Sequence, residues 1–205
     1  MDMGCGCGVI SFGILLLHRK KQLRVTGVEI CRELAEMAKD NALNLGLQEA
    51  FEVIEGDIKC LTRDSSLAQS FDSVVCNPPY RKRESGRTSP SSLKNLAHFE
   101  GETTLADFIK AGTYFLKTRG RFYLSWGSER LVELMVELRR HRLEPKRLMC
   151  VHGHLDNPCR IVLIECVKNG APALIIEPPL ILYEGSKGEN IPHERAVKFC
   201  PFIKK

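Results

Sequence analysis

Short apolar stretches alternate with segments of helical periodicity along most of this chain, and this alternation constrains the fold more than any other feature. Stretches typical of strands cover residues 24–29, 51–54 and 71–76, and the last is an apolar run typical of a buried parallel strand. Residues 32–47 place apolar side chains on one face of a helix. This alternation predicts an α/β fold with a doubly wound, mostly parallel sheet.

The second half of the chain continues the pattern. We expect a helix over 104–116, a strand over 120–126 and a further helix that Ser128 caps and that runs to residue 141. Residues 147–151 and 160–167 are typical of a final pair of strands, and we expect the C-terminal strand to be antiparallel to the others.

Length and composition limit the number of domains and the class of protein. With 205 residues, 43% hydrophobic and 27% charged, the chain matches one globular domain and not a disordered segment. The longest apolar run, residues 8–17, is too short to cross a membrane. Nine cysteines without a CxxC pair favour reduced thiols in the cytoplasm, and we expect no metal. We expect a domain over residues 1–177 and an irregular tail over 178–205, which packs on the domain or extends from it.

A glycine-rich turn opens the chain, in which Asp2, Gly4, Gly6 and Gly8 alternate with Met and Cys. Closely spaced glycines let the backbone turn tightly and approach a ligand. The apolar residues that follow are typical of a helix start, where nucleotide-like ligands bind. The spacing differs from GxGxxG, which disfavours NAD. Taken alone, the motif could also be a glycine-rich turn with no role in binding.

Two carboxylates lie at the carboxyl ends of expected strands. Glu29 ends a strand, where a carboxylate can accept hydrogen bonds from both ribose hydroxyls of a nucleoside. Asp57 can accept from the amino group of an adenine, with Ile58 against the ring. Each has an ordinary alternative, a solvated strand end or a simple turn. Together with the glycine turn, they favour a nucleotide-like cofactor.

The sharpest motif is Asn77-Pro78-Pro79-Tyr80, directly after an expected strand. The prolines stiffen the backbone and remove two N–H donors. The Asn77 amide oxygen and the Pro78 carbonyl can both accept from one –NH2 group, and Tyr80 offers a face for a planar base or amide. Two fixed acceptors draw that nitrogen toward tetrahedral geometry and free its lone pair for attack. Positioning then does most of the work, and no strong base is required.

A polar, basic segment over residues 81–96 follows this motif. Its cations Arg81, Lys82, Arg83 and Arg87 can bind the phosphates around an extruded base, and a solvated loop is the alternative. The net charge of +5 is compatible with a nucleic-acid partner.

Taken in order, DxGxGxG, a strand-end acid, GD and NPPY resemble a class I S-adenosylmethionine-dependent methyltransferase that acts on a planar amino group. Segments 97–100, 104–107, 116–124, 142–148 and 177–183 are similar to the bacterial tRNA(Val) adenine-37 N6-methyltransferase family, so the resemblance covers nearly the whole chain. It implies a Rossmann-like fold, S-adenosyl-L-methionine as cofactor and methyl transfer to the adenine immediately 3′ to the anticodon of one tRNA.

The resemblance also assigns roles to residues. It places the target adenine at Asn77 to Tyr80, and the cofactor at Asp2, Gly4, Gly6, Gly8, Glu29, Ile30, Asp57, Ile58 and Asn77.

Two departures from the family stand out. Ala97-His98-Phe99-Glu100 replaces a common Ala-Arg-His-Glu, which leaves the role of that basic pair open. Relatives carry a complete first strand before the glycine motif, whereas here only Met1 to Met3 remain, so we expect a largely truncated first strand.

Two other functions stay open. One is a methyltransferase that acts on another planar group, such as a release-factor glutamine, a DNA adenine or an rRNA guanine, although the C-terminal stretch favours the tRNA enzyme. The other is a truncated domain that binds RNA or a partner without catalysis, for which the short first strand is the best support.

Overall fold

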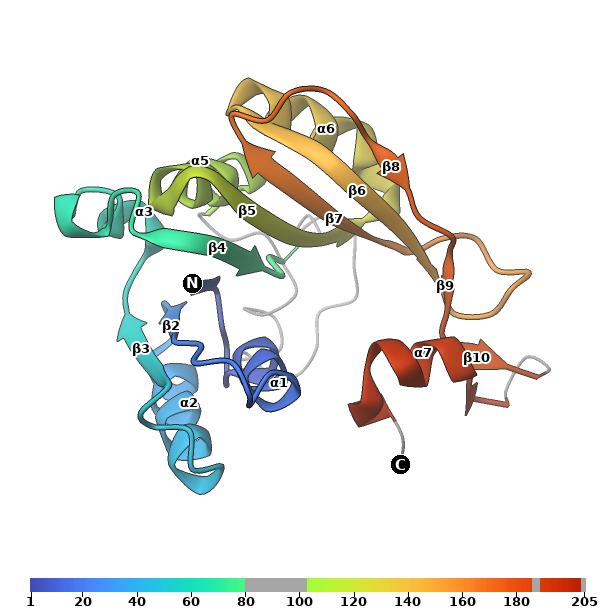
Figure 1. Ribbon diagram of the computed structural model, residues 1–205, viewed down its shortest axis with the longest axis horizontal. Helices are drawn as coiled ribbons and strands as arrows, with labels where there is room; N and C mark the ends of the chain where they lie inside the picture. Colours follow the sequence, from blue (N-terminus) through green and yellow to red (C-terminus); the bar gives the residue numbers. More distant parts are fainter. Residues whose placement is uncertain (80–102, 186–188, 204–205) are drawn as a thin grey trace.

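The computed structural model describes residues 1–79, 103–185 and 189–203 (Figure 1). In chain order the elements are β1 (Asp2–Met3), α1 (Val9–Leu17), β2 (Val25–Glu29), α2 (Arg32–Asn44), β3 (Phe51–Glu55), α3 (Ile58–Leu61), η1 (Ser65–Leu67), β4 (Phe71–Cys76), α5 (Leu105–Phe115), β5 (Leu116–Gly127), η3 (Ser128–Arg130), α6 (Leu131–Arg140), β6 (Leu143–His152), β7 (Ile161–Lys168), β8 (Ile175–Ile176), β9 (Leu180–Ile181), β10 (Tyr183–Glu184), β11 (Ile191–Pro192), α7 (Glu194–Phe199) and η4 (Pro201–Ile203).

One sheet organises the molecule, with strand order β3-β2-β1-β4-β5-β7-β6-β8 and β9 paired to β6. Neighbouring strands from β3 to β5 are parallel, and β7 is antiparallel to both β5 and β6. This confirms the expected class I arrangement with an antiparallel C-terminal strand. The first strand is indeed short, yet it lies at the centre of the sheet, where Asp2 is opposite both Gly27 and Val75.

The order of the strands creates a switch point between β1 and β4. The chain leaves β1 toward β2 and β3, and then returns to the other side of β1 with β4. In open α/β sheets a crevice forms at such a point, outside the carboxyl ends of the strands. The fold therefore places the glycine turn after β1 and Asn77 after β4 on the two sides of this switch point.

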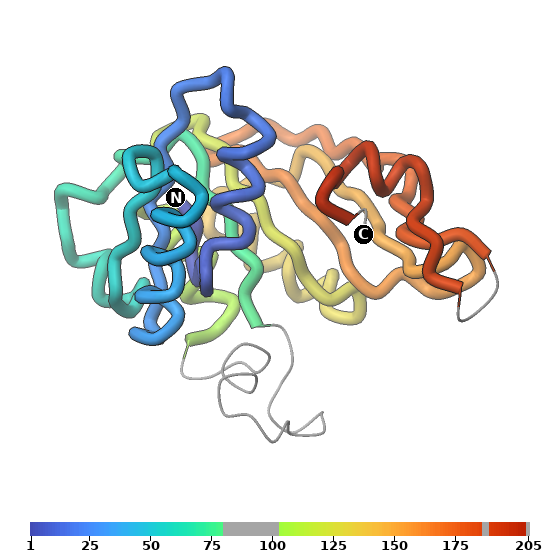
Figure 2. The backbone as a smooth tube through the Cα atoms, turned by 90° about the horizontal axis from the view of Figure 1, so that it is seen from below, coloured from blue at the N-terminus to red at the C-terminus, as the bar shows by residue number. Residues whose placement is uncertain are grey.

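Apolar clusters lie on both faces of the sheet. One, with Val28, Cys76 and Phe122 of the strands, packs against α3, α5 and α6. Another, with Val25 and Phe51, packs against α1 and α2. Figures 1 and 2 show α1, α2 and α7 on the side of the sheet opposite α5 and α6. None of the helices in the described part of the chain is long and apolar enough to cross a membrane.

The tail beyond residue 177 was expected to be irregular. Within the described residues it instead carries short regular elements. Strand β9 pairs with β6, β10 pairs with β11, and α7 follows. Leu180 and Ala196 form a small buried cluster with Val151 of β6. Strands of two residues carry too little periodicity for the sequence pattern to reveal them.

The predicted capping role of Ser128 is wrong. Residues Ser128–Arg130 form a 3-10 turn before α6, and the Ser128 hydroxyl donates to the Cys159 carbonyl at 2.7 Å. The hydroxyl therefore ties the start of this turn to the segment before β7. Strands β5 and β6 are also longer than expected; Pro145 and a register shift interrupt the pairing of β6, which hides the true length of that strand from a sequence pattern.

Candidate active site

The glycine turn joins β1 to α1 in a left-handed backbone path. Gly4, Gly6 and Gly8 have φ of 69°, 55° and 90°, a conformation that costs other residues about 1–2 kcal/mol. At Gly8 a Cβ would also lie 2.3 Å from the ring of Phe12, which is a prohibitive contact. The positive φ angles, together with the contact at Gly8, therefore favour glycine in this turn.

Glu29 holds the turn from the end of β2. Its Oε2 accepts a hydrogen bond from the Gly6 N–H at 2.8 Å, and its Oε1 accepts from the Cys31 N–H at 3.0 Å. The side chain is buried. Each carboxylate oxygen has two lone pairs, so each retains one for a further donor such as a ribose hydroxyl. Glu29 can therefore shape the turn and bind a nucleoside at once.

Asp2 lies in β1, directly before the glycine turn. It is fully buried in β1, and its Oδ2 accepts from the Ser11 hydroxyl of α1 at 2.7 Å. Its Oδ1 has no hydrogen-bond partner in the described part of the chain. Burial raises the pKa of this carboxyl above its ordinary value. Asp2 thus links β1 to α1, the two elements that the glycine turn joins.

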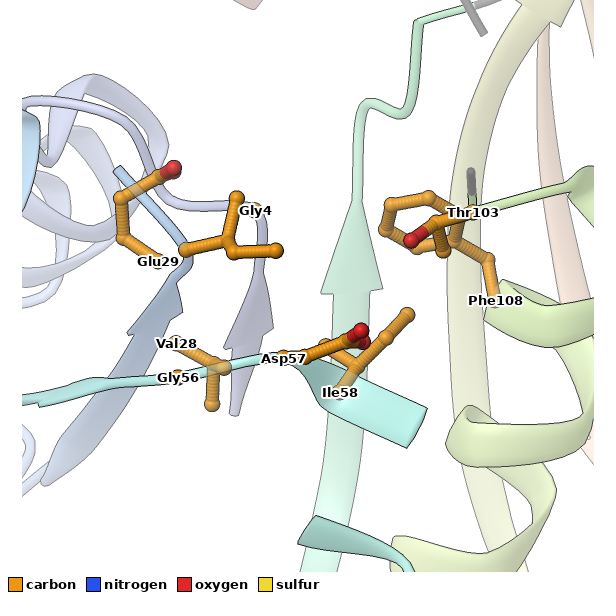
Figure 3. Close-up of a pocket in the computed structure, with 9 residues that line it drawn as sticks. Gly4, Val28, Glu29, Gly56, Asp57, Ile58, Thr103 and Phe108 are labelled. Atoms are coloured by element: carbon orange, nitrogen blue, oxygen red, sulfur yellow. The ribbon is translucent and has the colours of Figure 1, made fainter. Parts of the chain in front are cut away.

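A pocket of about 50 Å³ opens beside the turn at the carboxyl ends of the strands (Figure 3). Figure 3 shows Glu29 and Phe108 on opposite sides of it, with Asp57 and Ile58 between them. Its lining residues come from five parts of the chain: Gly4, Val28, Glu29, Ile30, Gly56, Asp57, Ile58, Thr103 and Phe108.

The pocket contains five of the residues predicted from the sequence to hold a cofactor: Gly4, Glu29, Ile30, Asp57 and Ile58. It adds four that the sequence reasoning did not assign to the cofactor: Val28, Gly56, Thr103 and Phe108. Other predicted residues, Asp2, Gly6, Gly8 and Asn77, do not line it.

Phe108 of α5 belongs both to the core and to the pocket wall. It is 8% exposed in the main apolar cluster, and a Cβ on Gly4 would lie 3.8 Å from its ring. Its place in the wall depends on how α5 packs against the glycine turn, which periodicity alone does not reveal.

Asp57 sits at the start of α3. Its Oδ1 accepts from the Lys59 N–H at 2.8 Å as a helix cap, and the Lys59 ammonium lies 3.6 Å from Oδ2. These contacts hold the carboxylate at the pocket wall while leaving lone pairs for the amino group of an adenine. Ile58, which is buried, follows it as an apolar surface beside the pocket.

Asn77 lies directly after β4 and is exposed, whereas Pro78 is buried. The Ser125 hydroxyl of β5 donates to the Asn77 Oδ1. Pro79 is half-buried. The last residue of the motif, Tyr80, lies outside the described residues, as do Arg81, Lys82, Arg83, Arg87 and the segment 97–100.

A second pocket, of about 320 Å³, lies against β4, β5, β6 and β7, with Ile10 of α1 and Phe199 of α7 at its border. Tyr123 and Ser125 line it. Because Ser125 also donates to Asn77, this pocket lies next to Asn77. Arg147 also lines it and forms an ion pair with Glu177, with 2.7 Å between Nε and Oε1.

Cysteines near the site are poor nucleophiles. Burial raises the pKa of the Cys5 thiol to about 12 and the pKa of Cys76 well above its ordinary value. Both therefore remain protonated at neutral pH. Among the described residues no group of three His, Cys, Asp or Glu side chains is arranged to hold a metal ion.

Comparison with known proteins assigns this arrangement to a family. The model of the methyltransferase small domain matches residues 1–132, which include the glycine turn, Glu29, Asp57 and the NPPY motif. The chain belongs to the methyltransferase small domain family. Methyltransferases with this fold use S-adenosyl-L-methionine as cofactor, and the donor set around the pocket suits its nucleoside part.

Two relatives of this chain have different named substrates. The tRNA1(Val) (adenine(37)-N6)-methyltransferase of Porphyromonas gingivalis is 32% identical over 72% of this chain and 57% of its own length. The release factor glutamine methyltransferase of Streptococcus pneumoniae is 30% identical over 80% of this chain and 58% of its own. The chain thus spans less than two thirds of each relative.

A solved structure of a predicted O-methyltransferase from Agrobacterium tumefaciens has the same fold as this methyltransferase. The two chains superpose with a TM-score of 0.71 at 20% identity, over 93% of this chain and 83% of the other.

Proposed function

We propose that this protein transfers a methyl group from S-adenosyl-L-methionine to N6 of an adenine in tRNA. The observation that carries the proposal is the position of Asn77 and Pro78 after β4, at the switch point that also holds the pocket with Gly4 and Glu29. The similarity to tRNA1(Val) adenine-37 enzymes over 72% of the chain supports adenine as the acceptor.

In the proposed reaction the cofactor supplies an electrophilic methyl group on its sulfonium. Glu29, Asp57 and Ile58 hold its nucleoside part at the pocket. The Asn77 amide oxygen and the Pro78 carbonyl accept hydrogen bonds from the target –NH2 and orient its lone pair toward the methyl group. Tyr80 provides a face for the target base. The methyl group moves to nitrogen, the sulfur keeps the bonding electrons, and the extra proton on nitrogen passes to solvent.

Several partner assignments belong to this proposal. Arg81, Lys82, Arg83 and Arg87 would bind tRNA phosphates around the extruded adenine. A tRNA substrate would place the reaction in the cytoplasm. Residues 1–177 would form the catalytic unit, and residues 178–205 a segment that packs on it through β9 and α7.

A second candidate is methylation of a release-factor glutamine. It is favoured by one observation, the 30% identity to the Streptococcus pneumoniae enzyme over 80% of this chain. A glutamine side-chain amide also presents a planar –NH2 to Asn77 and Pro78, so the proposed catalytic geometry serves both substrates.

The test is transfer of labelled methyl from S-adenosyl-L-methionine to two acceptors offered in the same reaction, an unmodified tRNA1(Val) transcript and a bacterial release factor. The proposal expects label in the RNA alone. Label in the release factor alone would support the second candidate. Cofactor binding with no label in either acceptor would contradict both.

A further inference from the structure

Asn77, directly after β4, and Ser125, within the parallel strand β5, occupy neighbouring positions. Pairing of β4 with β5 joins Ser73 to Arg121 and continues in step to Cys76 opposite Leu124. The next pair in this register is Asn77 with Ser125. The hydrogen bond from the Ser125 hydroxyl to the Asn77 Oδ1 is therefore built into the register of the sheet.

The two side chains differ in freedom. Asn77 is exposed, whereas Ser125 is half-buried on a strand that pairs on both sides, with β4 and with β7. The terminal torsion of an asparagine side chain is broad, so an unrestrained amide turns either its oxygen or its –NH2 toward a ligand. The oxygen alone can accept a hydrogen bond from an amine. Half of the orientations of a free amide are thus unproductive for the proposed reaction.

A hydroxyl that donates to Oδ1 removes this ambiguity. A carbonyl oxygen has two lone pairs, so Oδ1 can accept from Ser125 and from a target –NH2 together. The serine is anchored by the sheet, and it therefore fixes the amide against a rigid element.

We propose that Ser125 is a positioning residue that holds the Asn77 amide with its oxygen toward the target amino group. This inference rests on the proposed function of Asn77. Ser125 acts through Asn77 and contributes to the rate of transfer, and it does not contribute to cofactor binding because it does not line the pocket with Glu29.

The test measures transfer to a tRNA1(Val) transcript by wild type, Ser125→Ala, Ser125→Thr and Asn77→Ala. Ser125→Ala should lower kcat about threefold to tenfold, as expected for one lost hydrogen bond, with KM for the cofactor unchanged. Ser125→Thr keeps the hydroxyl and should restore kcat. In an Asn77→Ala background, Ser125→Ala should lower kcat no further.

Ser128→Ala is the matched control. Its hydroxyl also donates to a carbonyl oxygen, that of Cys159, but away from Asn77. It should leave kcat unchanged. Equal loss in Ser125→Ala and Ser128→Ala would overturn the inference, since it would indicate a general effect of lost hydrogen bonds.

A second measurement is independent of turnover. In nitrogen-15 NMR spectra, the side-chain amide of Asn77 should be ordered in wild type and in Ser125→Thr, and mobile in Ser125→Ala. An amide equally ordered in all three would overturn the inference.

These outcomes separate the inference from the proposed function. Full activity in Asn77→Ala would contradict the role of Asn77 in the proposed function. A large loss in Asn77→Ala with wild-type kcat in Ser125→Ala would contradict the positioning role alone.

Discussion

The buried carboxylate of Glu29 accepts a hydrogen bond from the Gly6 N–H at 2.8 Å, which joins the end of β2 to the glycine turn after β1. The same side chain holds the Cys31 N–H at the start of α2. One acid therefore joins the turn and the strand end that border the pocket proposed to hold the cofactor. Substitutions at Glu29 should accordingly affect binding before chemistry.

Glu29→Ala should weaken binding of S-adenosyl-L-methionine by at least about tenfold, because hydrogen bonds to a charged group contribute about 1.5–3 kcal/mol. Calorimetric titration measures the change. Glu52→Ala is the control, since Glu52 is exposed on β3 and binds Thr26 away from the pocket. Unchanged affinity in Glu29→Ala would remove this residue from the cofactor site.

Asn77→Ala should lower the rate of methyl transfer by more than about tenfold while cofactor affinity stays at the wild-type value. The reason is that the proposed function gives Asn77 a role at the target amine, and Asn77 does not line the pocket with Glu29. Single-turnover kinetics and calorimetry on the same preparation give the two quantities. Parallel losses of affinity and rate would contradict this role.

Gly8→Ala should destabilise the fold by about 2–5 kcal/mol, since the new methyl group would collide with Phe12 and the backbone has a positive φ. Gly46→Ala separates the two causes. Gly46 has a φ of 66° but no atom within 4 Å of the added Cβ, so it should cost about 1–2 kcal/mol. Urea unfolding of both variants measures the difference. Equal costs would show that the contact with Phe12 is relieved without penalty.

Asp2 should make stability depend on pH. Because burial raises its pKa in the folded state, folding favours the protonated carboxyl. This contribution is fully present below the ordinary pKa of 3.8 and is lost as the pH rises through the folded value. The free energy of unfolding of wild type minus that of Asp2→Asn should therefore fall as the pH rises from about 4 to about 7.

Urea unfolding at a series of pH values gives this difference. The α-amino group of Met1, whose pKa burial lowers to about 6, is coupled to Asp2 through their charges, so the difference reports the titration of this pair. A difference that rises with pH would contradict the effect of burial on Asp2.

The sequence predicted the main sheet well where a strong local signal exists. Each of β2, β3 and β4 places apolar side chains in the core, among them Val28, Phe51 and Val74, and α2 buries one face, so these elements have a visible apolar pattern. Glu29 and Asp57, which both line the pocket, were singled out because Glu29 ends one strand and Asp57 comes shortly after another, and both strands are visible in the sequence.

The remaining features depend on contacts between distant parts of the chain. Phe108 and Thr103 reach the pocket through the packing of α5, and Ser125 reaches Asn77 through a strand register. No local sequence pattern predicts either the packing of α5 or this strand register. The bond from Gly6 to Glu29 likewise joins two motifs that the sequence shows only separately.

The most direct test of the proposed function is nucleoside mass spectrometry of a tRNA1(Val) transcript incubated with the protein and S-adenosyl-L-methionine. The account predicts N6-methyladenosine in the transcript with adenine at position 37, and none in a matched transcript with guanine there. Cofactor binding without N6-methyladenosine in either transcript would contradict it, as would equal methylation of both.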